Sequence, residues 1–477
     1  MLFNSFPFLF LFLPIVTAVY VLMRKYLGQR VAQTFLLLSS FFFYGYAKPS
    51  YVPLLAASIL FNWFIASWMG SAQRNQRADA PRRRALLWVG LSANIALLCS
   101  FKYVNFFLKH LAFLNAQRLT LPNWEFPLGI SFFTLTQVMY LVDTYEGLNP
   151  PNSLFDHATL VSFFPYVSSG PLVRSRAIVP QFKTSTKSVG RFDLACRGLY
   201  LFSLGLAKKV IFADSFARIA DAGFGRAQNF STVEAWVFSL SYTFQIYFDF
   251  SGYSDMAVGC AWMLGIDIPQ NFNAPYISKS ISEFWKRWHI SLSNFITDYL
   301  YTPILRSLGK ATITTSVIAV LIAMSIVGLW HGPAWTFVIF GTLHGCALAM
   351  NQVWRRRKMR LPAWLGWLLT FVFVDLSFVF FRSANVPAAI RMLDAMLPHA
   401  HPLGTAALKG VLPLTPYLVL RPITIGIVLA FFFKTSQQLA EKFRPTHHTA
   451  FATAALILVC IFFMNSTATK EFVYFAF

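Results

Sequence analysis

Residues 6–23 read FPFLFLFLPIVTAVYVLM and residues 311–330 read ATITTSVIAVLIAMSIVGLW, and neither stretch contains a charged side chain. A helix needs about 20 apolar residues to cross the hydrocarbon core of a bilayer, which is about 30 Å thick. Each stretch therefore predicts a transmembrane helix. The first has no basic region before it and no small-residue cleavage site after it, so we interpret it as a retained span and not as a signal peptide.

Similar apolar runs recur along the whole chain, so we expect an all-α polytopic membrane protein whose residues 1–477 form one membrane domain. The twelve predicted spans lie near residues 6–23, 31–48, 51–70, 86–108, 126–146, 198–218, 232–250, 311–330, 334–352, 361–382, 413–433 and 449–465. Two further segments, 156–172 and 254–267, are apolar but short or interrupted by Gly and Pro. We expect them to be re-entrant and shielded by protein, because irregular backbone exposed to lipid leaves its polar groups unsatisfied.

The composition supports a membrane protein. Apolar residues make up 56% of the chain and charged residues only 12%, against 45–50% and about 25% in soluble domains. These proportions argue against a soluble enzyme, a disordered chain or a nucleic-acid-binding protein. The five Cys residues form no C-x-x-C pair, so neither a disulfide framework nor a zinc ribbon is indicated.

The net charge of +22 comes from Lys and Arg residues in short loops between the predicted spans. The clusters are Arg24, Lys25 and Arg30; Arg74, Arg77 and Arg82 to Arg84; Arg174, Arg176, Lys183, Lys187 and Arg191; Lys279, Lys286, Arg287, Arg306 and Lys310; Arg355 to Lys358 and Arg360; and Lys434, Lys442 and Arg444. All six fall on one side of the membrane if both termini lie on the other. Because basic loops stay in the cytosol, we expect both termini to be periplasmic.

Ionisable and polar residues gather between residues 245 and 345, among apolar neighbours. An ionisable group is costly inside a membrane, so each is a functional hypothesis. The candidates are Asp249, Asp255, Glu283, Lys286, Arg287, His289, Trp330, His331 and His344. Asp249 and Asp255 flank a Ser-Gly pair, where we expect a turn at the end of a span.

His331 is followed by Gly332 and Pro333, which interrupt a regular helix. An imidazole at such a break can face a cavity and accept a proton near neutral pH. The alternative is a structural histidine bonded to a backbone carbonyl. His344 follows thirteen residues later, out of step with His331 on a continuous helix, and we expect a packing or hydrogen-bonding role for it.

His289 lies in FWKRWHISLS, residues 284–293, where aromatic residues alternate with cations. One interpretation is an interfacial amphipathic helix with its aromatic rings at the headgroups. The other uses Lys286 and Arg287 to bind phosphates and His289 at the reacting group. A metal site is not expected, because neither H-x-x-H nor H-E-x-x-H occurs, and G-x-S-x-G is absent as well.

Three longer stretches carry a family resemblance. They are QIYFDFSGYSDMAVG at 245–259, NFNAPYISKSISEFWKRWHISLSNFITDYLY at 271–301 and GLWHG at 328–332. In this order they resemble the membrane-bound O-acyltransferase family, and within it the bacterial branch that O-acetylates alginate. FKYVNFF at 101–107, PLGISFFTLTQVMYLVDTYEG at 127–147, FFPYVSSGPLVRSRAIVPQF at 163–182 and LAKKVIFADSFA at 206–217 also resemble family segments. The resemblance covers about residues 1–350, and the spans in 361–465 match only as further spans.

The resemblance implies an enzyme of the bacterial inner membrane that takes acetyl from cytosolic acetyl-CoA through a tunnel between its helices. The acceptor would be an extracellular or cell-envelope polysaccharide such as alginate, cellulose or peptidoglycan, reached directly or through a periplasmic or membrane-anchored acetyltransferase partner. His331 corresponds to the family's catalytic histidine and His289 to its second polar position. Lys286 and Arg287 would meet the CoA phosphates, with Asp249, Asp255, Glu283, Trp330 and His344 in supporting roles.

Two departures from the alginate branch leave the acceptor open. Residues 302–310 read TPILRSLGK where a Gly-Gly-Asn-Arg turn is usual, and residues 167–171 read VSSGP where Ala-Gly-Pro is common. D-alanyl transfer to a teichoic-type polymer is one alternative. Another is a non-catalytic transporter of a glycan or acyl carrier, but transporters commonly have interrupted helices in both halves of the chain, whereas here the unusual polar stretches cluster in 245–345.

Overall fold

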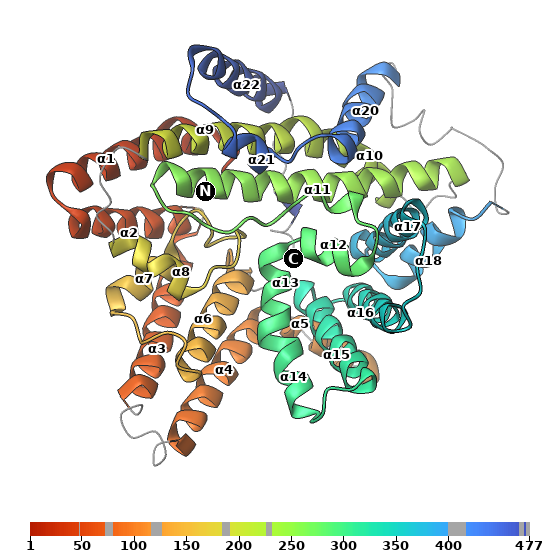
Figure 1. Ribbon diagram of the computed structural model, residues 1–477, viewed down its shortest axis with the longest axis horizontal. Helices are drawn as coiled ribbons and strands as arrows, with labels where there is room; N and C mark the ends of the chain where they lie inside the picture. The colour runs from red at the N-terminus through yellow and green to blue at the C-terminus, as the bar shows by residue number, and fades with distance from the viewer. Residues whose placement is uncertain are drawn as a thin grey trace. The chain divides into compact units, whose positions relative to one another are not determined.

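The computed structural model describes residues 1–46, 48–71, 80–115, 126–183, 191–225, 231–398, 416–466 and 472–473, and within these ranges the regular structure is entirely helical (Figure 1). The chain divides into two compact units. Unit 1 comprises residues 1–202 and 256–269, and unit 2 comprises residues 203–255 and 270–477. Two long helices, α9 and α11, contribute residues to both units.

Unit 1 contains the N-terminal helices. They are the π-helical turn η1 (Pro7–Phe12), α1 (Leu13–Tyr26), α2 (Gln29–Gly45), the short η2 (Pro49–Tyr51), α3 (Val52–Ser71), α4 (Ala80–Lys102), α5 (Val104–Asn115), α6 (Ile130–Tyr145), α7 (Leu154–Ser162), α8 (Ser175–Lys183), most of α9 (Arg191–Ala207) and the end of α11 (Thr232–Met263). The chain is irregular after α7, and residues 163–173 are buried within the unit.

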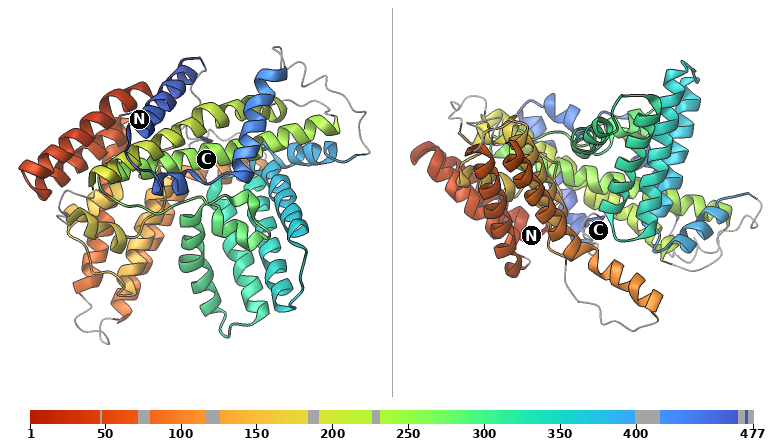
Figure 2. Two further views of the ribbon diagram at one scale, coloured as in Figure 1. Left: turned by 45° about the horizontal axis from the view of Figure 1, so that its top comes forward. Right: turned by 90° about the horizontal axis from the view of Figure 1, so that it is seen from below.

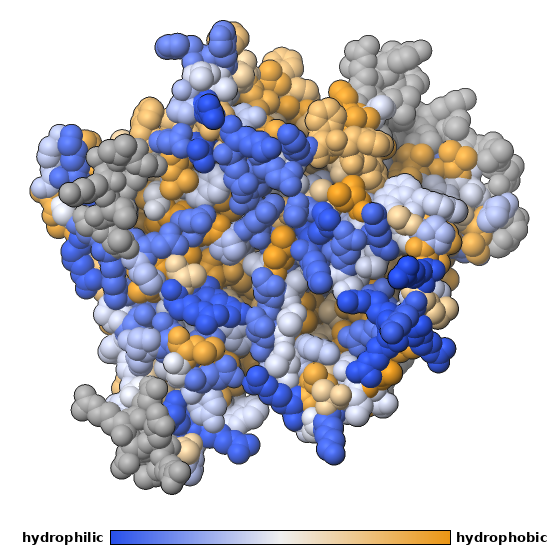
Figure 3. Space-filling view, viewed as in Figure 1, coloured by the Kyte–Doolittle hydropathy of each residue, from blue (hydrophilic) through white to orange (hydrophobic). Residues whose placement is uncertain are grey.

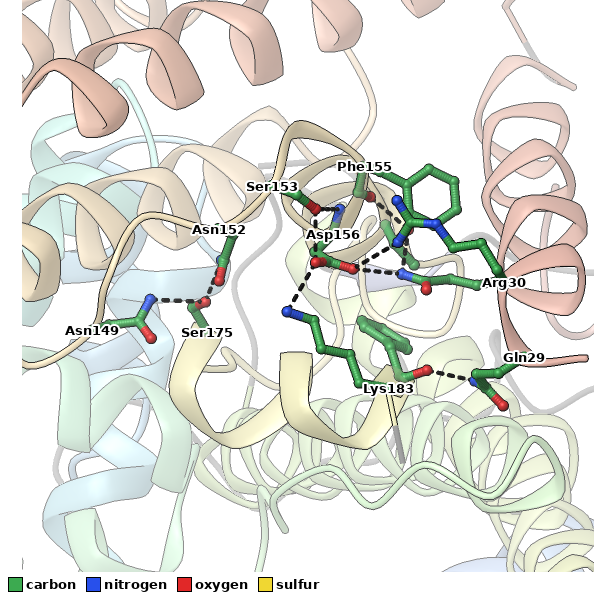
Figure 4. Close-up of polar contacts among 12 residues, drawn as sticks. Gln29, Arg30, Asn149, Asn152, Ser153, Phe155, Asp156, Ser175 and Lys183 are labelled. Carbon is green, nitrogen blue, oxygen red and sulfur yellow. Dashed lines mark hydrogen bonds and ion pairs between the residues drawn. The ribbon is translucent and has the colours of Figure 1, made fainter. Parts of the chain in front are cut away.

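A polar network in unit 1 is centred on Asp156 in the first turn of α7 (Figure 4). The Ser153 hydroxyl caps α7 by accepting from the Asp156 backbone N–H, and it donates to the Asp156 carboxylate at 2.7 Å. Lys183 of α8 lies 3.0 Å from the same carboxylate, and Gln33 of α2 donates to it at 3.1 Å. A buried carboxylate with several donors joins its neighbours firmly, so Asp156 connects α2, α7 and α8.

Unit 2 holds the remaining elements. They are η5 (Lys208–Ala213), α10 (Asp214–Phe224), most of α11, η6 (Pro275–Ile277), α12 (Ile281–Arg287), α13 (Ile290–Phe295), η7 (Ile296–Tyr301), α14 (Thr302–Ser307), α15 (Ile313–His331), α16 (Trp335–Arg356), α17 (Ala363–Arg382), α18 (Val386–Ala395), α20 (Pro416–Phe432), α21 (Ser436–Glu441) and α22 (His447–Ser466). Helices α15, α16 and α17 run side by side (Figure 2).

Two glycines allow α15 and α16 to pack closely. A Cβ atom added to Gly328 would lie 2.4 Å from the Phe337 carbonyl oxygen and 2.9 Å from the Cα atom of Gly341. Small residues at a helix crossing let two backbones approach, which is a common arrangement between membrane helices. The α15–α16 hairpin, which carries His331 and His344, therefore has little room for larger side chains at its crossing point.

Among the described residues, seven helices are long and apolar enough to cross a membrane, which makes the chain a multi-pass membrane protein. They are Pro7–Tyr26, Pro49–Ser71, Ala80–Lys102, Ile313–His331, Trp335–Arg356, Ala363–Arg382 and His447–Asn465. Each overlaps one of the twelve predicted spans. Of the other five, 31–48 and 126–146 correspond to the shorter helices α2 and α6, 198–218 and 232–250 lie inside longer helical runs, and 413–433 begins outside the described residues.

The turn expected at the Ser-Gly pair between Asp249 and Asp255 is wrong. Helix α11 continues without a break through this stretch, from Thr232 to Met263. Gly252 allows α11 to pack closely on α9, because a Cβ atom at this position would lie 2.7 Å from the carbonyl oxygen of Gly205. The segment predicted to be re-entrant at 254–267 is accordingly helical as far as Met263, and the turn follows at Gly265, whose φ is 74°.

Candidate active site

All nine residues singled out in the sequence lie in unit 2, so their arrangement can be compared within one compact body. His289 is the most constrained of them. It lies between α12 and α13 with φ 44° and ψ 55°, a left-handed conformation that few residues other than glycine adopt. Holding it costs roughly 1 kcal/mol or more. The conformation reverses the chain so that the His289 side chain is completely buried.

Asn271 fixes the orientation of the His289 ring. The Asn271 Oδ1 atom lies 3.1 Å from His289 Nδ1, 3.1 Å from the backbone nitrogen of Ser291 and 2.9 Å from the Ser291 hydroxyl. The backbone N–H of Ser291 can only donate, so the Asn271 atom that it meets is the carbonyl oxygen and not the amide nitrogen. An oxygen acceptor requires a proton on His289 Nδ1, which makes Nε2 the basic nitrogen of the ring.

Burial also determines the charge of His289. Removal from water lowers the pKa of this imidazole to about 3, so the ring is neutral near pH 7. The ring of Phe250, on α11, meets it edge to face with 4.7 Å between the ring centroids. The neutral ring therefore has a defined tautomer with Nε2 as its acceptor nitrogen, but a pKa this low makes it a weaker general base than an ordinary histidine.

His331 is the last residue of α15. The helix ends there because Gly332 is extended and Pro333 follows, as the sequence predicted. The side chain is buried against aromatic rings, with centroid distances of 5.0 Å to Trp330, 5.1 Å to Phe381 and 6.1 Å to Phe340. The helix break therefore places His331 inside unit 2, among rings from α16 and α17.

One aromatic wall connects the two histidines. Successive ring contacts of 4.7 to 6.2 Å lead from His289 through Phe250, Phe272, Trp288, Phe378 and Phe381 to His331. The members come from α11, the loop before α12, the α12–α13 junction, α15 and α17. Residues up to about 130 positions apart in the chain thus form a continuous series of aromatic contacts.

His344 has a different environment. The indole N–H of Trp285 donates to its Nδ1 atom at 3.2 Å, so its proton is on Nε2, which lies 2.9 Å from the Ser377 hydroxyl. Ser377 in turn donates to the carbonyl oxygen of Val374 at 2.7 Å. Both ring nitrogens of His344 are used in joining α12, α16 and α17. This arrangement matches the hydrogen-bonding role expected from the sequence.

The cations of α12 divide into one paired and one exposed residue. Arg287 forms an ion pair with Glu283 at 2.9 Å and donates to the carbonyl oxygen of Asn273 at 3.2 Å, whereas Lys286 is exposed. Phe284 and Trp285 on the same short helix are buried within unit 2. The structure therefore does not support the interpretation of this segment as an interfacial helix with its aromatic rings among the lipid headgroups.

Asp249 and Asp255 each pair with a lysine of η5. Lys209 lies 2.7 Å from Asp249 and 3.0 Å from Asp214, and Lys208 lies 2.7 Å from Asp255. The Lys209 and Asp249 side chains are each only 2% exposed. These lysines lie in LAKKVIFADSFA and could not be assigned a role from sequence, because Asp249 and Asp255 are 40 and 47 residues away from them. These ion pairs join α11 to η5.

Asp375 on α17 is a buried acidic residue that the sequence analysis did not single out. Its carboxylate accepts from the hydroxyls of Ser239 at 2.9 Å and Thr243 at 2.7 Å, both on α11. An acidic residue within an apolar span is a signal that would have identified it. Among the described residues, no cluster of three His, Cys, Asp or Glu side chains is suited to binding a metal ion.

Comparison with known proteins gives the class of the molecule. Residues 81–387, which include the α12–α17 region with its buried histidines, match the family model described as MBOAT, membrane-bound O-acyltransferase family. The chain belongs to this family and is an acyltransferase.

Two relatives cover most of the chain. A peptidoglycan O-acetyltransferase of Helicobacter pylori is 39% identical over 427 residues, which span 83% of this chain and 80% of the relative. A probable alginate O-acetylase, AlgI, of Pseudomonas aeruginosa is 38% identical over 83% of this chain and 75% of the relative. A teichoic acid D-alanyltransferase of Streptococcus thermophilus is 29% identical over 53% of this chain and 68% of the relative.

Proposed function

We propose that this acyltransferase moves acetyl groups from cytosolic acetyl-CoA to hydroxyl groups of an extracellular or cell-envelope polysaccharide. The observation that carries the proposal is the pair of buried histidines, His289 and His331, on one aromatic wall. Similarity to a peptidoglycan O-acetyltransferase and to a probable alginate O-acetylase supports an acetyl group and a polysaccharide acceptor. The D-alanyltransferase relative has lower identity and covers less of the chain.

In the proposed reaction His331 removes the proton from the acceptor hydroxyl. The oxygen then attacks the thioester carbonyl, the new C–O bond forms, the C–S bond breaks, and the thiol of CoA leaves with a proton. A thioester is already activated, so positioning and proton removal are what the protein has to supply, and a positioned general base contributes roughly 10²–10⁴-fold. The apolar wall excludes water that would hydrolyse the donor.

His289 is proposed to assist His331 by orienting the acceptor hydroxyl, because its neutral ring presents Nε2 as a hydrogen-bond acceptor. Lys286 is the better candidate for the CoA phosphates, since it is exposed while Arg287 is paired with Glu283. Asp249 and Asp255 are proposed to hold the scaffold through Lys209 and Lys208. Trp330 packs on the ring of His331, and Glu283 and His344 support the fold around the site.

The wider arrangement is also a proposal. We infer that the chain is one membrane domain in the bacterial inner membrane, with twelve crossings, re-entrant segments around a tunnel and both termini in the periplasm. The basic loops support this orientation. A periplasmic or membrane-anchored acetyltransferase partner would then receive the acetyl group if transfer is indirect. Labelling by an impermeant thiol reagent in intact cells tests the orientation: Thr467→Cys should be labelled and Ala78→Cys should not, both positions being outside the described residues.

The experiment that tests the function uses the full-length protein reconstituted in lipid. It is incubated with acetyl-CoA labelled in the acetyl group and with peptidoglycan or alginate as acceptor, with His331→Ala as the matched control. Label appearing in the polysaccharide, or in a co-reconstituted partner, is the expected result. If the wild-type protein consumes no acetyl-CoA with any acceptor or partner, or if His331→Ala transfers acetyl at the same rate, the proposal is wrong.

A further inference from the structure

Unit 2 contains a cavity of about 130 Å³ whose lining includes no histidine. Four parts of the chain line it, namely the end of α9 with η5, the middle of α11, Ala274 just before η6, and the segment from the end of α20 into α21. Its volume is comparable with the engineered cavity of about 150 Å³ that binds benzene. The cavity therefore accommodates a small group with part of an apolar chain.

The cavity is lined by aromatic side chains and by two positively charged ones. Phe212, Tyr247, Phe248 and Phe433 supply aromatic surface, and Lys208 and Lys434 supply two ammonium groups. No acidic residue is among the side chains that line it. The cavity therefore suits a ligand with an anionic group and an apolar part, because an ammonium group attracts the anion while the rings remove apolar surface from water.

The two lysines contribute differently. Lys208 donates to Asp255 at 2.7 Å and to the Ser436 hydroxyl at 2.7 Å, and Ser436 also hydrogen-bonds to Asp255. This Lys208–Asp255–Ser436 group is neutral overall and fixes one side of the cavity. Lys434 is exposed, and no carboxylate in the described part of the chain pairs with it. The net positive charge of the cavity therefore comes from Lys434.

The surface around Lys434 has the composition expected at the level of the lipid headgroups. Phe432 and Phe433 directly before it are 80% and 60% exposed. Apolar residues reach the surface over α20, and hydrophilic residues begin beside them over α21 (Figure 3). Exposed aromatic residues followed by a cation are typical of the level of the lipid headgroups.

We infer that this cavity, between η5, α11 and the α20–α21 connection, binds the phosphate headgroup and upper acyl chain of an anionic phospholipid. Lys434 meets the phosphate, and the aromatic walls contact the chain. Most of the residues that line the cavity lie after residue 387, where the family match ends. The inference does not depend on whether His289 or His331 is the catalytic base. The same chemistry is present in a soluble phosphate ester, so the test has to separate a lipid from acetyl-CoA.

The test uses the full-length protein in detergent, titrated with phosphatidylglycerol or with phosphatidylcholine of equal chain length, and bound lipid is counted by native mass spectrometry. Lys434→Gln is expected to weaken phosphatidylglycerol binding about fivefold, the effect of one cation near an anionic lipid. Ala430→Phe fills the cavity without changing charge and should remove the tightest-bound lipid. Lys442→Gln, a neighbouring cation that does not line the cavity, is the matched control and should have little effect.

Three results would overturn the inference. Equal loss of lipid in Lys434→Gln and Lys442→Gln would mean diffuse attraction to a basic surface. Full retention of lipid in Ala430→Phe would mean that the lipid binds elsewhere, because the phenylalanine fills the cavity. A thermal unfolding scan of the same sample shows whether the variant is folded. Displacement of the bound lipid by acetyl-CoA, with Lys434→Gln weakening acetyl-CoA binding instead, would assign the cavity to the soluble donor.

Discussion

The carbonyl oxygen of Asn271 accepts hydrogen bonds from both His289, at 3.1 Å, and the backbone of Ser291, at 3.1 Å. A single amide oxygen thus sets the tautomer of a buried histidine and also holds the start of the helix that follows it. Asn271 is eighteen residues before His289, and irregular chain, η6 and α12 lie between them. The pair nevertheless determines which nitrogen of His289 is basic.

Substitution of Asn271 should change the pH dependence of acetyl transfer. Asn271→Asp keeps an oxygen acceptor against His289 Nδ1 but adds a negative charge, which raises the pKa of His289. We expect the acidic limb of the kcat profile to move to higher pH, whereas Asn271→Leu should lower kcat about tenfold or more. Ser291→Ala is the control, because it removes only the hydroxyl bond to Asn271. An unchanged pH profile in Asn271→Asp would show that His289 takes no part in proton transfer.

The three buried histidines of unit 2 should respond differently to truncation. His331→Ala is expected to lose acetyl transfer by roughly two to four orders of magnitude, the usual contribution of a positioned general base. His289→Ala should lose less, because an assisting residue contributes less than the base itself. His344→Ala should retain the most activity. Rates per mole of folded, inserted protein decide the order, and a larger loss in His344→Ala than in His331→Ala would contradict the assignment.

His344→Ala should instead affect stability. It removes the acceptor of the Trp285 indole N–H and a partner of Ser377. Leaving buried polar groups unsatisfied costs about 1–3 kcal/mol each. We expect a lower midpoint of thermal unfolding in detergent, measured by intrinsic fluorescence. A double variant that also carries Trp285→Phe should regain part of the loss, since the unsatisfied N–H is then absent.

The neutral state of His289 predicts how stability depends on pH. Its pKa is about 3 in the folded protein, whereas an exposed histidine has a pKa near 6.5, so between these values the unfolded chain binds the extra proton. The contribution is fully present above about pH 6.5, and it falls by up to about 1.4 kcal/mol per pH unit below that value. His289→Gln should reduce this slope in unfolding curves recorded from pH 7 to pH 4. An identical slope in both proteins would mean that His289 is accessible to protons when folded.

Substituting only one partner of the buried Lys209–Asp249 ion pair should lower the free energy of unfolding. Lys209→Met leaves the Asp249 and Asp214 carboxylates without their shared cation, and removal of one partner of a buried pair costs about 3–5 kcal/mol. Combining it with Asp249→Asn should cost less than the sum of the two single changes. Arg197→Met, which breaks a half-exposed ion pair with Asp193, is the surface control and should cost under 1 kcal/mol.

Lys286 offers a test of donor binding. Because phosphates are bound alike in the ground and transition states, Lys286→Gln should raise the KM for acetyl-CoA with little change in kcat. Arg287→Gln should have a smaller effect on KM, since Arg287 is already paired with Glu283. Saturation curves for the two variants distinguish these outcomes. An unchanged KM in Lys286→Gln would exclude this residue from the donor site.

The sequence predicted features that depend on local pattern and missed those that depend on distant contacts. The end of α15 at His331 was predictable because Pro333 lacks a backbone N–H and also disfavours helical backbone at Gly332, the residue before it. The Ser-Gly pair in α11 was misleading, because Gly252 serves close packing against Gly205 and only the folded chain shows that contact. The partners of Asp249, Asp255 and His289 lie 18 or more residues away, and no spacing rule connects them.

The glycine crossing between α15 and α16 also sets the position of His331. Gly328 precedes His331 by three residues, close to one helical turn, so both lie toward the same side of α15. A methyl group at Gly328 or Gly341 would meet the backbone of the opposite helix within 2.4 Å and push the hairpin apart. The imidazole would move with its helix, and general-base catalysis is sensitive to displacements of about 1 Å. The geometric tolerance of the proposed reaction is thus set in part by two glycine hydrogen atoms, which lie near the imidazole but take no part in the chemistry.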